Sequence, residues 1–266
     1  MRSIPCALTV AGSDSGGCAG IQADLKTFAA LGVHGMSAIT ASTVQDTRRV
    51  HEILPLPPDH VARQIDAAVG DPGVDSVKTG MIPSPEAVEA VSDRIRFHRL
   101  ERIVVDPVIR SGYGHALAGG EAVSRMKSLL FPLTLVLTPN RHESELLTGR
   151  EIRSEEDAVQ AARLLLDMGP RAVVIKGGHF RDPESSTDLL FTGTGRVRLK
   201  GPRLSSRDTH GSGCTFASAI AAHLARGSGL EESVRRAKDY VTEAIRHSLR
   251  LGTGSGPLGH FHALGN

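Results

Sequence analysis

The sequence contains no tryptophan, and only two tyrosines and seven phenylalanines occur among its 266 residues. A protein core built with so few aromatic rings must be mostly aliphatic. This composition favours buried parallel strands of Val, Ile and Leu that pack between Ala-rich helices. With 40% apolar and 23% charged residues, the chain has ordinary globular proportions. No repeat and no linker rich in Pro or Ser divides it, so we predict a single domain over residues 1–266.

Cysteines and long apolar runs are also scarce. The three cysteines, Cys6, Cys18 and Cys214, form no Cys-x-x-Cys pair, which argues against a disulfide framework and against a structural zinc site. No stretch approaches the roughly 20 apolar residues that span a bilayer. The apolar run over residues 4–11 is too short for a signal peptide. We therefore expect a cytoplasmic protein without a membrane partner.

Charge of one sign does not dominate the chain. The formal net charge is +2, from 31 basic and 29 acidic residues, and pairs such as Arg235 and Arg236 lie among acids at helical spacing. We expect solvated faces here and no nucleic-acid partner. The chain also lacks the Gly-x-x-x-x-Gly-Lys-Ser/Thr motif of P-loop kinases, the protein-kinase signatures and a Gly-x-Gly-x-x-Gly in register after its first strand. These absences argue against a P-loop kinase, a protein kinase and a dinucleotide oxidoreductase.

What the chain does contain is an alternation of short apolar runs with longer amphipathic stretches. Because crossover units place helices on both sides of a sheet, the alternation predicts a mainly parallel sheet covered on both faces. A hairpin near residue 194 predicts an antiparallel edge. The predicted strands are 7–11, 36–40, 74–78, 103–106, 133–137, 172–176, 188–192 and 196–200. The predicted helices are 21–31, 60–69, 85–97, 120–130, 155–168, 214–226 and 231–249, and Ser154 with Asp157 indicates a capping box.

The segment over residues 208–215 reads Asp-Thr-His-Gly-Ser-Gly-Cys-Thr and leads directly into a helix. Gly211 and Gly213 allow close approach of a ligand to the backbone, and the amides from Ser212 to Thr215 are expected to be unpaired donors at a helix N-terminus, which favours anions. The same field would lower the pKa of Cys214, which could then accept a proton from an alcohol. The alternative is a turn into a core helix with a buried cysteine.

Polar residues follow the apolar runs at the expected carboxyl ends of the strands, where open parallel sheets bind ligands. Asp106 and Glu143, with Asn140, offer the oxygen ligands that Mg²⁺ prefers, and Lys176 offers a charge for phosphate oxygens. Alone, Lys176 could equally be a lysine that extends to solvent from a strand end. Together these groups suggest transfer of a phosphoryl group from ATP to a hydroxyl.

Several segments resemble those of hydroxymethylpyrimidine/phosphomethylpyrimidine kinases of thiamine biosynthesis, members of the ribokinase superfamily. The resemblance covers the whole chain and is carried by residues 11–14 and 19–28, Thr138-Pro139-Asn140 with Glu143, residues 176–179, residues 209–215, and the tail residues 256–257 and 260–263. It implies a three-layer α/β/α sandwich with a mainly parallel central sheet, an antiparallel edge and no separate lid domain. It also implies ATP and Mg²⁺ as cofactors and suggests a homodimer.

The resemblance further implies two successive reactions. ATP phosphorylates the hydroxymethyl group of 4-amino-5-hydroxymethyl-2-methylpyrimidine, and the same enzyme then converts the monophosphate to the diphosphate. The pyrimidine would contact Gly12, Ala19, Asp24, Val44, Gln45, Met81 and Val108. Asn140, Lys176 and Thr209 would bind the nucleotide, Asp106 and Glu143 the metal, and Gly211, Ser212, Gly213, Cys214 and Lys176 would carry the chemistry.

Two other functions compete with this reading. A pyridoxal or pyridoxine kinase of the same superfamily would use the same magnesium site and the same cysteine, but its members often carry Met where this chain has Gln45. Gln45 therefore favours a pyrimidine. A sensor that binds a phosphorylated pyrimidine without turnover would need no base, so the set Asp106, Glu143, Lys176 and Cys214 argues against it.

Overall fold

The computed structural model describes residues 4–110, 114, 116–177 and 185–264. One mixed sheet of nine strands runs through them in the order β3-β2-β1-β4-β5-β6-β7-β8-β9. The strands are β1 (Cys6–Asp14), β2 (His34–Gln45), β3 (Val50–Pro55), β4 (Ser76–Thr79), β5 (Ile103–Val105), β6 (Val136–Leu137), β7 (Ala172–Ile175), β8 (Ser185–Thr192) and β9 (Gly195–Pro202).

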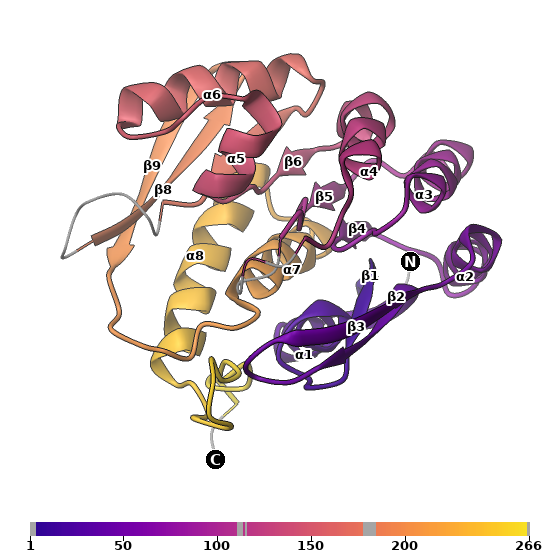
Figure 1. Cartoon of the computed structure of the whole chain (residues 1–266), viewed down its shortest axis with the longest axis horizontal. Helices are drawn as coiled ribbons and strands as arrows, with labels where there is room; N and C mark the ends of the chain where they lie inside the picture. Colours follow the sequence, from indigo (N-terminus) through magenta and orange to yellow (C-terminus); the bar gives the residue numbers. More distant parts are fainter. Residues whose placement is uncertain (1–3, 111–113, 115, 178–184, 265–266) are drawn as a thin grey trace.

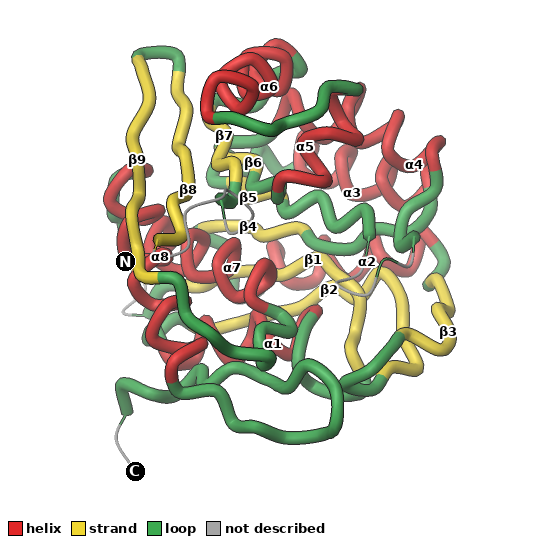
Figure 2. The backbone as a smooth tube through the Cα atoms, turned by 60° about the vertical axis from the view of Figure 1, so that its left-hand side comes forward, coloured by secondary structure: helices red, strands yellow, loops and turns green. Residues whose placement is uncertain are grey.

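The centre of this sheet is parallel and its edges are antiparallel. Strands β2, β1, β4, β5, β6 and β7 pair in parallel. The expected hairpin of β8 and β9 forms one edge and extends alongside the helices (Figure 2). The other edge, β3, pairs antiparallel with β2. It was not predicted, because its partly or fully exposed residues do not alternate between apolar and polar as a half-buried strand would.

Helices cover both faces of the sheet (Figure 1). They are α1 (Gly20–Ala30), α2 (Pro58–Gly70), α3 (Pro85–Phe97), α4 (Gly120–Arg125), α5 (Arg141–Thr148), α6 (Glu155–Asp167), α7 (Ser212–Ala225) and α8 (Leu230–Arg246). On one face of the sheet, the helices α2, α3, α4, α5 and α6 pack against the strands in one core cluster. On the other face, α1, α7 and α8 form a second core cluster with the strands. Neighbouring residues such as Val104 and Val105 point to opposite clusters, as the period of two in a strand requires.

Several boundaries differ from the sequence prediction; for example, β2 is longer than the predicted strand over 36–40. Residues 133–137 were expected to form a strand, but a 3₁₀ turn over Phe131–Leu133, which includes Pro132, leaves only Val136–Leu137 paired. The predicted helix over 120–130 continues past α4 as a π-helical stretch, Met126–Leu130. The capping box at Ser154 and Asp157 is confirmed at the start of α6.

The carboxyl ends of the parallel strands meet at one rim, as the alternation predicts. Strand β1 carries a bulge at this rim, because its register with β2 shifts between Ala11 and Ser13. Among the described residues, no helix combines the length and apolarity that crossing a membrane requires. The division of residues 1–266 into one domain stays a prediction.

Candidate active site

A pocket of about 630 Å³ lies beyond the carboxyl ends of the parallel strands. It brings together most of the residues selected from the sequence, although they come from seven separate segments of the chain. The predicted residues that line it are Gly12, Ala19, Gln45, Met81, Asp106, Val108, Asn140, Glu143, Lys176, Thr209, Gly211, Ser212, Gly213 and Cys214. Gly178 and His179, which also carried the family resemblance, lie outside the described residues.

The loop before α7 requires glycine at two positions. Gly211 has a φ of 82°, and a Cβ there would lie 2.0 Å from the Cys18 carbonyl oxygen. At Gly213 a Cβ would lie 3.3 Å from Lys176 Nζ and 3.5 Å from Asp106 Oδ2. The first glycine therefore permits the turn, and the second lets the start of α7 approach an ion pair closely.

The expectation of four unpaired amides from Ser212 to Thr215 is wrong for two of them. Ser212 N–H donates to the Thr209 carbonyl at 3.1 Å, and Thr215 N–H donates to the Gly211 carbonyl at 2.8 Å. Among the described residues, the amides of Gly213 and Cys214 have no protein acceptor. These two N–H groups, at the positive end of α7, remain to bind an anion.

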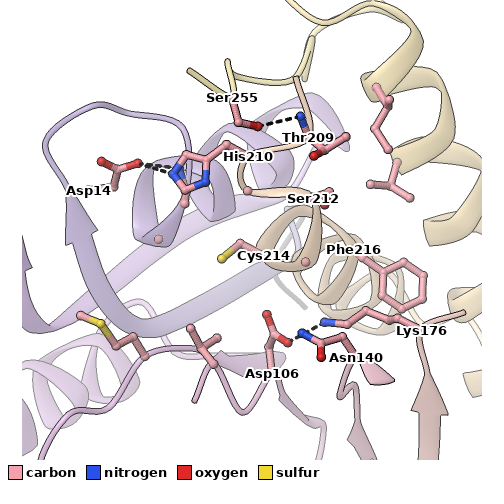
Figure 3. A pocket seen from close by; sticks show the side chains of 18 of the residues that line it. Asp14, Asp106, Asn140, Lys176, Thr209, His210, Ser212, Cys214, Phe216 and Ser255 are labelled. Carbon is pink, nitrogen blue, oxygen red and sulfur yellow. Dashed lines mark hydrogen bonds and ion pairs between the residues drawn. The ribbon is translucent and has the colours of Figure 1, made fainter. Parts of the chain in front are cut away.

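Cys214 lies in this pocket, with its sulfur directed into the space between His210 and Asp106 (Figure 3). The predicted lowering of its pKa is wrong for this structure. Burial raises the pKa of Cys214 to about 11, and the charges of Asp24 and Asp106 also raise it, whereas Lys78 opposes them. Desolvation of the thiolate therefore outweighs the field of the helix, and the free protein holds a thiol.

Asp106 and Lys176 form an ion pair on the other side of the pocket (Figure 3). Lys176 Nζ donates to Asp106 Oδ1 at 2.9 Å. Burial acts to lower the pKa of Lys176, but the negative charges of Asp106 and Glu143 raise it above its usual value. Lys176 is thus a fixed positive charge next to Gly213, which suits the phosphate oxygens proposed for it.

Glu143 and Asn140 hold the first turn of α5 together. Asn140 Oδ1 accepts from the Glu143 amide at 2.9 Å, and Glu143 Oε2 accepts from the Asn140 amide at 2.8 Å, which completes a capping box. Burial raises the pKa of Glu143 to about 7; Lys176 lowers it and Asp106 raises it. A carboxyl group in this state loses its proton most readily when a further positive charge arrives.

The donor set at this end of the pocket fits Mg²⁺. The two carboxylates of Asp106 and Glu143 are hard oxygen ligands, and the negative charge of Asp106 raises the pKa of Glu143. Within the described residues, no group of three or more His, Cys, Asp or Glu side chains is placed to hold a metal ion. An ion held here would rely on water and phosphate oxygens for most of its ligands, as Mg²⁺ commonly does.

Asp24 does not take the position expected for a substrate contact. Its side chain is fully buried, and its carboxylate binds Lys78 Nζ at 2.8 and 2.9 Å. Two hydroxyls also donate to it, those of Thr9 and Ser218, each at 2.6 Å. The expected contact with an exocyclic amine is therefore wrong here, because protein donors occupy both carboxylate oxygens below the pocket.

Val44 is likewise placed away from the pocket. It is 54% exposed on β2, whereas its neighbours Thr43 and Gln45 line the pocket. The alternation of side chains along the strand directs residues 43 and 45 to one face and Val44 to the other. The predicted apolar cover of the substrate is left to Met81 and Val108. Val108 has a φ of 36°, which is strained for a β-branched residue.

Sequence reasoning missed or undervalued several lining residues. Lys78 was assigned only to the end of a strand, and its neighbours in the sequence, Asp75, Ser76 and Thr79, gave no signal that its side chain is buried. Asp14 belongs to the segment 11–14 that carried the resemblance but was given no role of its own, and its carboxylate accepts from the amides of Gly16, Cys18 and Ala19. The far end of the pocket, with Ser186, Asp188, Lys238 and Thr242, was not anticipated because these side chains come from the hairpin and α8.

The C-terminal tail supports the loop before α7. Ser255 Oγ accepts from the Thr209 amide at 3.2 Å (Figure 3), and Asp208 Oδ1 accepts from the Gly256 amide at 2.8 Å. Further along, His260 Nε2 lies 3.0 Å from Thr215 Oγ1 in the first turn of α7. The tail motif that carried part of the resemblance thus anchors the anion-binding loop from behind.

The profile of the family described as phosphomethylpyrimidine kinase matches residues 14–259. The chain belongs to this family. It is 45% identical to the hydroxymethylpyrimidine/phosphomethylpyrimidine kinase of Bacillus subtilis over 97% of its own length and 96% of that protein. It is 50% identical to a thiamine biosynthesis bifunctional protein of Geobacter sulfurreducens, and there the match covers 96% of this chain but only 52% of the relative.

Solved structures of related kinases share the fold. A pyridoxal kinase of Staphylococcus aureus in complex with AMP-PCP and pyridoxal superposes with a TM-score of 0.91 at 34% identity, covering 99% of this chain and 96% of the other. A phosphomethylpyrimidine kinase of Clostridium difficile superposes with a TM-score of 0.81 at 38% identity, covering 91% and 99%. The predicted ribokinase-like α/β/α sandwich is confirmed, with an antiparallel strand at each edge of its sheet.

Proposed function

We propose that this protein uses ATP to phosphorylate 4-amino-5-hydroxymethyl-2-methylpyrimidine and then phosphorylates the monophosphate to the diphosphate. The observation that carries the proposal is the convergence on one pocket of the Gly213 and Cys214 amides, which have no acceptor in the described part of the chain, with the Asp106–Lys176 pair and Gln45. Full-length relatives named for these two kinase activities support the substrate class.

In the first reaction the chain's residues position and neutralise the transferring group. The amides of Gly213 and Cys214 donate to its oxygens, and Lys176 supplies a positive charge from the adjacent strand end. Because phosphoryl transfer spreads negative charge over these oxygens, donors fixed in advance lower the barrier. Asn140 and Thr209 line the same side and are assigned to the nucleotide.

Cys214 is proposed to accept the proton of the attacking hydroxyl. The free protein holds it as a thiol, so this role requires a lowering of its pKa when ligands bind. The Lys78 charge already acts in that direction. In the second reaction the acceptor is a phosphate, which is already anionic, so removal of a proton matters less.

Mg²⁺ is proposed to be held by Asp106 and Glu143, where it would neutralise charge on the phosphate oxygens. The chain's own part is to present two buried carboxylates of which one, Glu143, is easily protonated in the absence of a cation. Lys176 holds Asp106 in a fixed orientation through the 2.9 Å contact.

The heterocycle is proposed to lie between Gly12, Ala19, Met81 and Val108, with Gln45 at its polar edge. Gly12 and Ala19 have no side chain or a small one and so leave space for the ring, and Met81 and Val108 supply apolar contacts to its flat face. The Gln45 amide can both accept from an amine and donate to a ring nitrogen.

The decisive experiment is an ATP-dependent assay with the purified protein, Mg²⁺ and the hydroxymethylpyrimidine, with mass spectrometry of the products over time. The monophosphate should appear first and the diphosphate later, and omission of Mg²⁺ should stop both. Absence of either product with a folded protein would overturn the proposal.

A pyridoxal kinase is the second candidate, because pyridoxal kinase structures superpose with a TM-score of 0.91. Side-by-side values of kcat/KM for pyridoxal and the hydroxymethylpyrimidine decide between the two.

We also propose a homodimer, supported by the exposed apolar side chains of Val44 and Leu54 at the edge of the sheet, and a cytoplasmic location. Light scattering of the purified protein tests the dimer.

A further inference from the structure

His210 and Gln45 touch although they are 165 residues apart in the sequence. His210 Nε2 lies 2.6 Å from Gln45 Nε2, and both side chains line the pocket. His210 comes from the loop before α7, directly next to Gly211. Gln45 is the last residue of β2. The anion-binding loop therefore contacts the side chain that meets the substrate ring.

This contact has a defined polarity. Two nitrogen atoms at 2.6 Å form a hydrogen bond only if one donates and the other accepts. The amide nitrogen of glutamine can only donate, so with the amide placed this way His210 Nε2 accepts, and the ring is the neutral tautomer with its proton on Nδ1. Burial lowers the pKa of His210, while the charge of Asp14 raises it, and the net lowering is consistent with a neutral ring.

Asp14 is a charged group that faces His210, with Oδ2 3.7 Å from Nε2 (Figure 3). That oxygen already accepts from the amides of Cys18 and Ala19 at 2.9 and 2.8 Å. Its capacity is therefore used by the loop over residues 14–19, and Gln45 is the nearer partner of His210 Nε2. The neutral imidazole of His210 thus lies between the Asp14 carboxylate and the Gln45 amide.

The remaining contacts leave the Gln45 amide dependent on His210. The Gln45 main chain is fixed by Ser15, whose Oγ accepts from its N–H and donates to its carbonyl, each at 2.9 Å. Gln45 Oε1 lies 3.4 Å from Thr43 Oγ1, but that hydroxyl donates to the Ser13 carbonyl at 2.9 Å. Because one hydroxyl has a single proton, the amide oxygen is held only weakly.

We propose that His210 is a positioning residue that determines specificity. By accepting a hydrogen bond from the Gln45 amide nitrogen, it fixes the orientation in which this amide meets the substrate ring. An aminopyrimidine edge presents an amine donor next to a ring-nitrogen acceptor. The amide oxygen and the second N–H of Gln45 match that order in one orientation only, as glutamine matches adenine. If the amide were flipped, its N–H would face the amine donor of the ring and its oxygen would face the ring-nitrogen acceptor.

The proposal rests on the proposed function, since it explains how this pocket selects an amino-bearing ring. It does not make His210 a support of the loop. The loop has independent anchors, namely Ser255 to the Thr209 amide and Asp208 to the Gly256 amide. Removal of the imidazole acceptor should therefore free the Gln45 amide while the loop stays in place.

The test uses the hydroxymethylpyrimidine and its analogue that lacks the 4-amino group, with kcat and KM measured for both. In the wild type the amine should be preferred. His210→Phe keeps a flat ring without an acceptor, and it should raise KM for the amino substrate and reduce the preference by about tenfold or more, with a smaller change in kcat. His210→Asn retains a side-chain acceptor and should restore part of the preference.

A double-mutant cycle separates positioning from a general structural effect. In a Gln45→Met background, His210→Phe should change the preference by less than about threefold, since the amide that it orients is gone. Ser255→Ala loosens the same loop without touching Gln45 and should slow both substrates alike.

Three results would overturn the proposal: no preference for the amine in the wild type, equal loss on both substrates in His210→Phe, or an undiminished effect in the Gln45→Met background. If His210→Phe does not fold, as judged by circular dichroism, His210→Ala, which also lacks the acceptor, carries the same comparison against Gln45→Met. Failure of the proposed function would look different, because the wild type would then phosphorylate neither compound.

Discussion

Lys78 and Asp24 form an ion pair that is fully shielded from solvent, with Lys78 Nζ 2.9 and 2.8 Å from the two carboxylate oxygens. Burial acts to lower the pKa of Lys78, but the charge of Asp24 raises it above its usual value. Ser218, one turn beyond Cys214 on α7, donates to the same carboxylate at 2.6 Å. The pair thus links β4, α1 and α7 beneath the pocket.

Removing one member of this pair should be costly. Lys78→Met leaves the Asp24 carboxylate buried without its counter-charge, and we expect the free energy of unfolding to fall by about 3–5 kcal/mol. The double variant Lys78→Met with Asp24→Asn carries no buried charge and should recover much of that loss. Urea unfolding followed by circular dichroism measures all three proteins. Equal stability of Lys78→Met and wild type would show that the pair is not buried in solution.

Cys214 should matter unequally for the two proposed reactions. Cys214→Ala removes the proton acceptor, so transfer to the hydroxymethyl group should slow by about 100-fold or more. Transfer to the monophosphate, whose acceptor is already ionised, should slow much less. Separate initial rates with each substrate provide the measurement, and Cys214→Ser serves as the matched control for side-chain size. Equal slowing of both reactions would remove the cysteine from the role of base.

The order of strands and helices could be read from the sequence because most of the sheet is buried on both faces. Runs such as Ala172–Ile175 and Ile103–Val105 have no polar interruption and lie between amphipathic helices. Strand β3 and helix α5 were not predicted. Val50–Pro55 is an edge strand with exposed charge, and Arg141–Thr148 is short and begins with polar residues used for capping.

The site could be predicted only as far as the rim of the sheet determines it. Asp106 and Lys176 directly follow strands and Gln45 ends one, so they converge, but the direction of Val44 depends on the pleat of a strand whose length was underestimated. The environment of Asp24 depends on Lys78 and Ser218, which come from elements distant in sequence. The pKa of Cys214 was predicted in the wrong direction because the helix field was visible in the sequence and the degree of burial was not.

Glu143 should make stability depend on pH. Burial raises its pKa to about 7 from a usual value of 4.5, so the folded protein binds more protons than the unfolded chain between these values. The contribution of this group to the free energy of unfolding is therefore most favourable below pH 4.5 and is lost as pH rises through 7. Relative to wild type, Glu143→Gln should gain stability at pH 8, by about 3 kcal/mol in the absence of divalent cations.

Denaturant unfolding at pH 5 and pH 8, in the presence of a chelator, tests this expectation. The difference between wild type and Glu143→Gln should be small at pH 5 and larger at pH 8. Glu145→Gln, on the same helix but not among the residues that line the pocket, is the matched control. A difference that does not change with pH would place the pKa of Glu143 near its ordinary value.

His260 should produce the opposite pH dependence. Burial lowers its pKa to about 4 from 6.5, with a smaller effect of the Lys26 charge, so the unfolded chain binds more protons between these values. Its contribution to stability is complete above pH 6.5 and is lost as pH falls through 4. His260→Gln should therefore reduce the loss of stability between pH 7 and pH 4, although it weakens the contact with Thr215 at neutral pH. Unfolding at pH 4.5 and 7.5 checks the sign.

Gly211 and Gly213 should respond very differently to the same substitution. At Gly211 an added Cβ meets the Cys18 carbonyl oxygen at 2.0 Å and the φ of 82° is unfavourable, so Gly211→Ala should lower the free energy of unfolding by about 2 kcal/mol or more. At Gly213 the nearest atoms are Lys176 Nζ at 3.3 Å and Asp106 Oδ2 at 3.5 Å. Gly213→Ala should fold almost normally, yet the methyl group crowds the place where the phosphoryl group is proposed to bind, and kcat should fall by about tenfold or more. Unfolding curves and steady-state kinetics on both variants separate the two effects. A fully active Gly213→Ala protein would move the transferring group away from this ion pair.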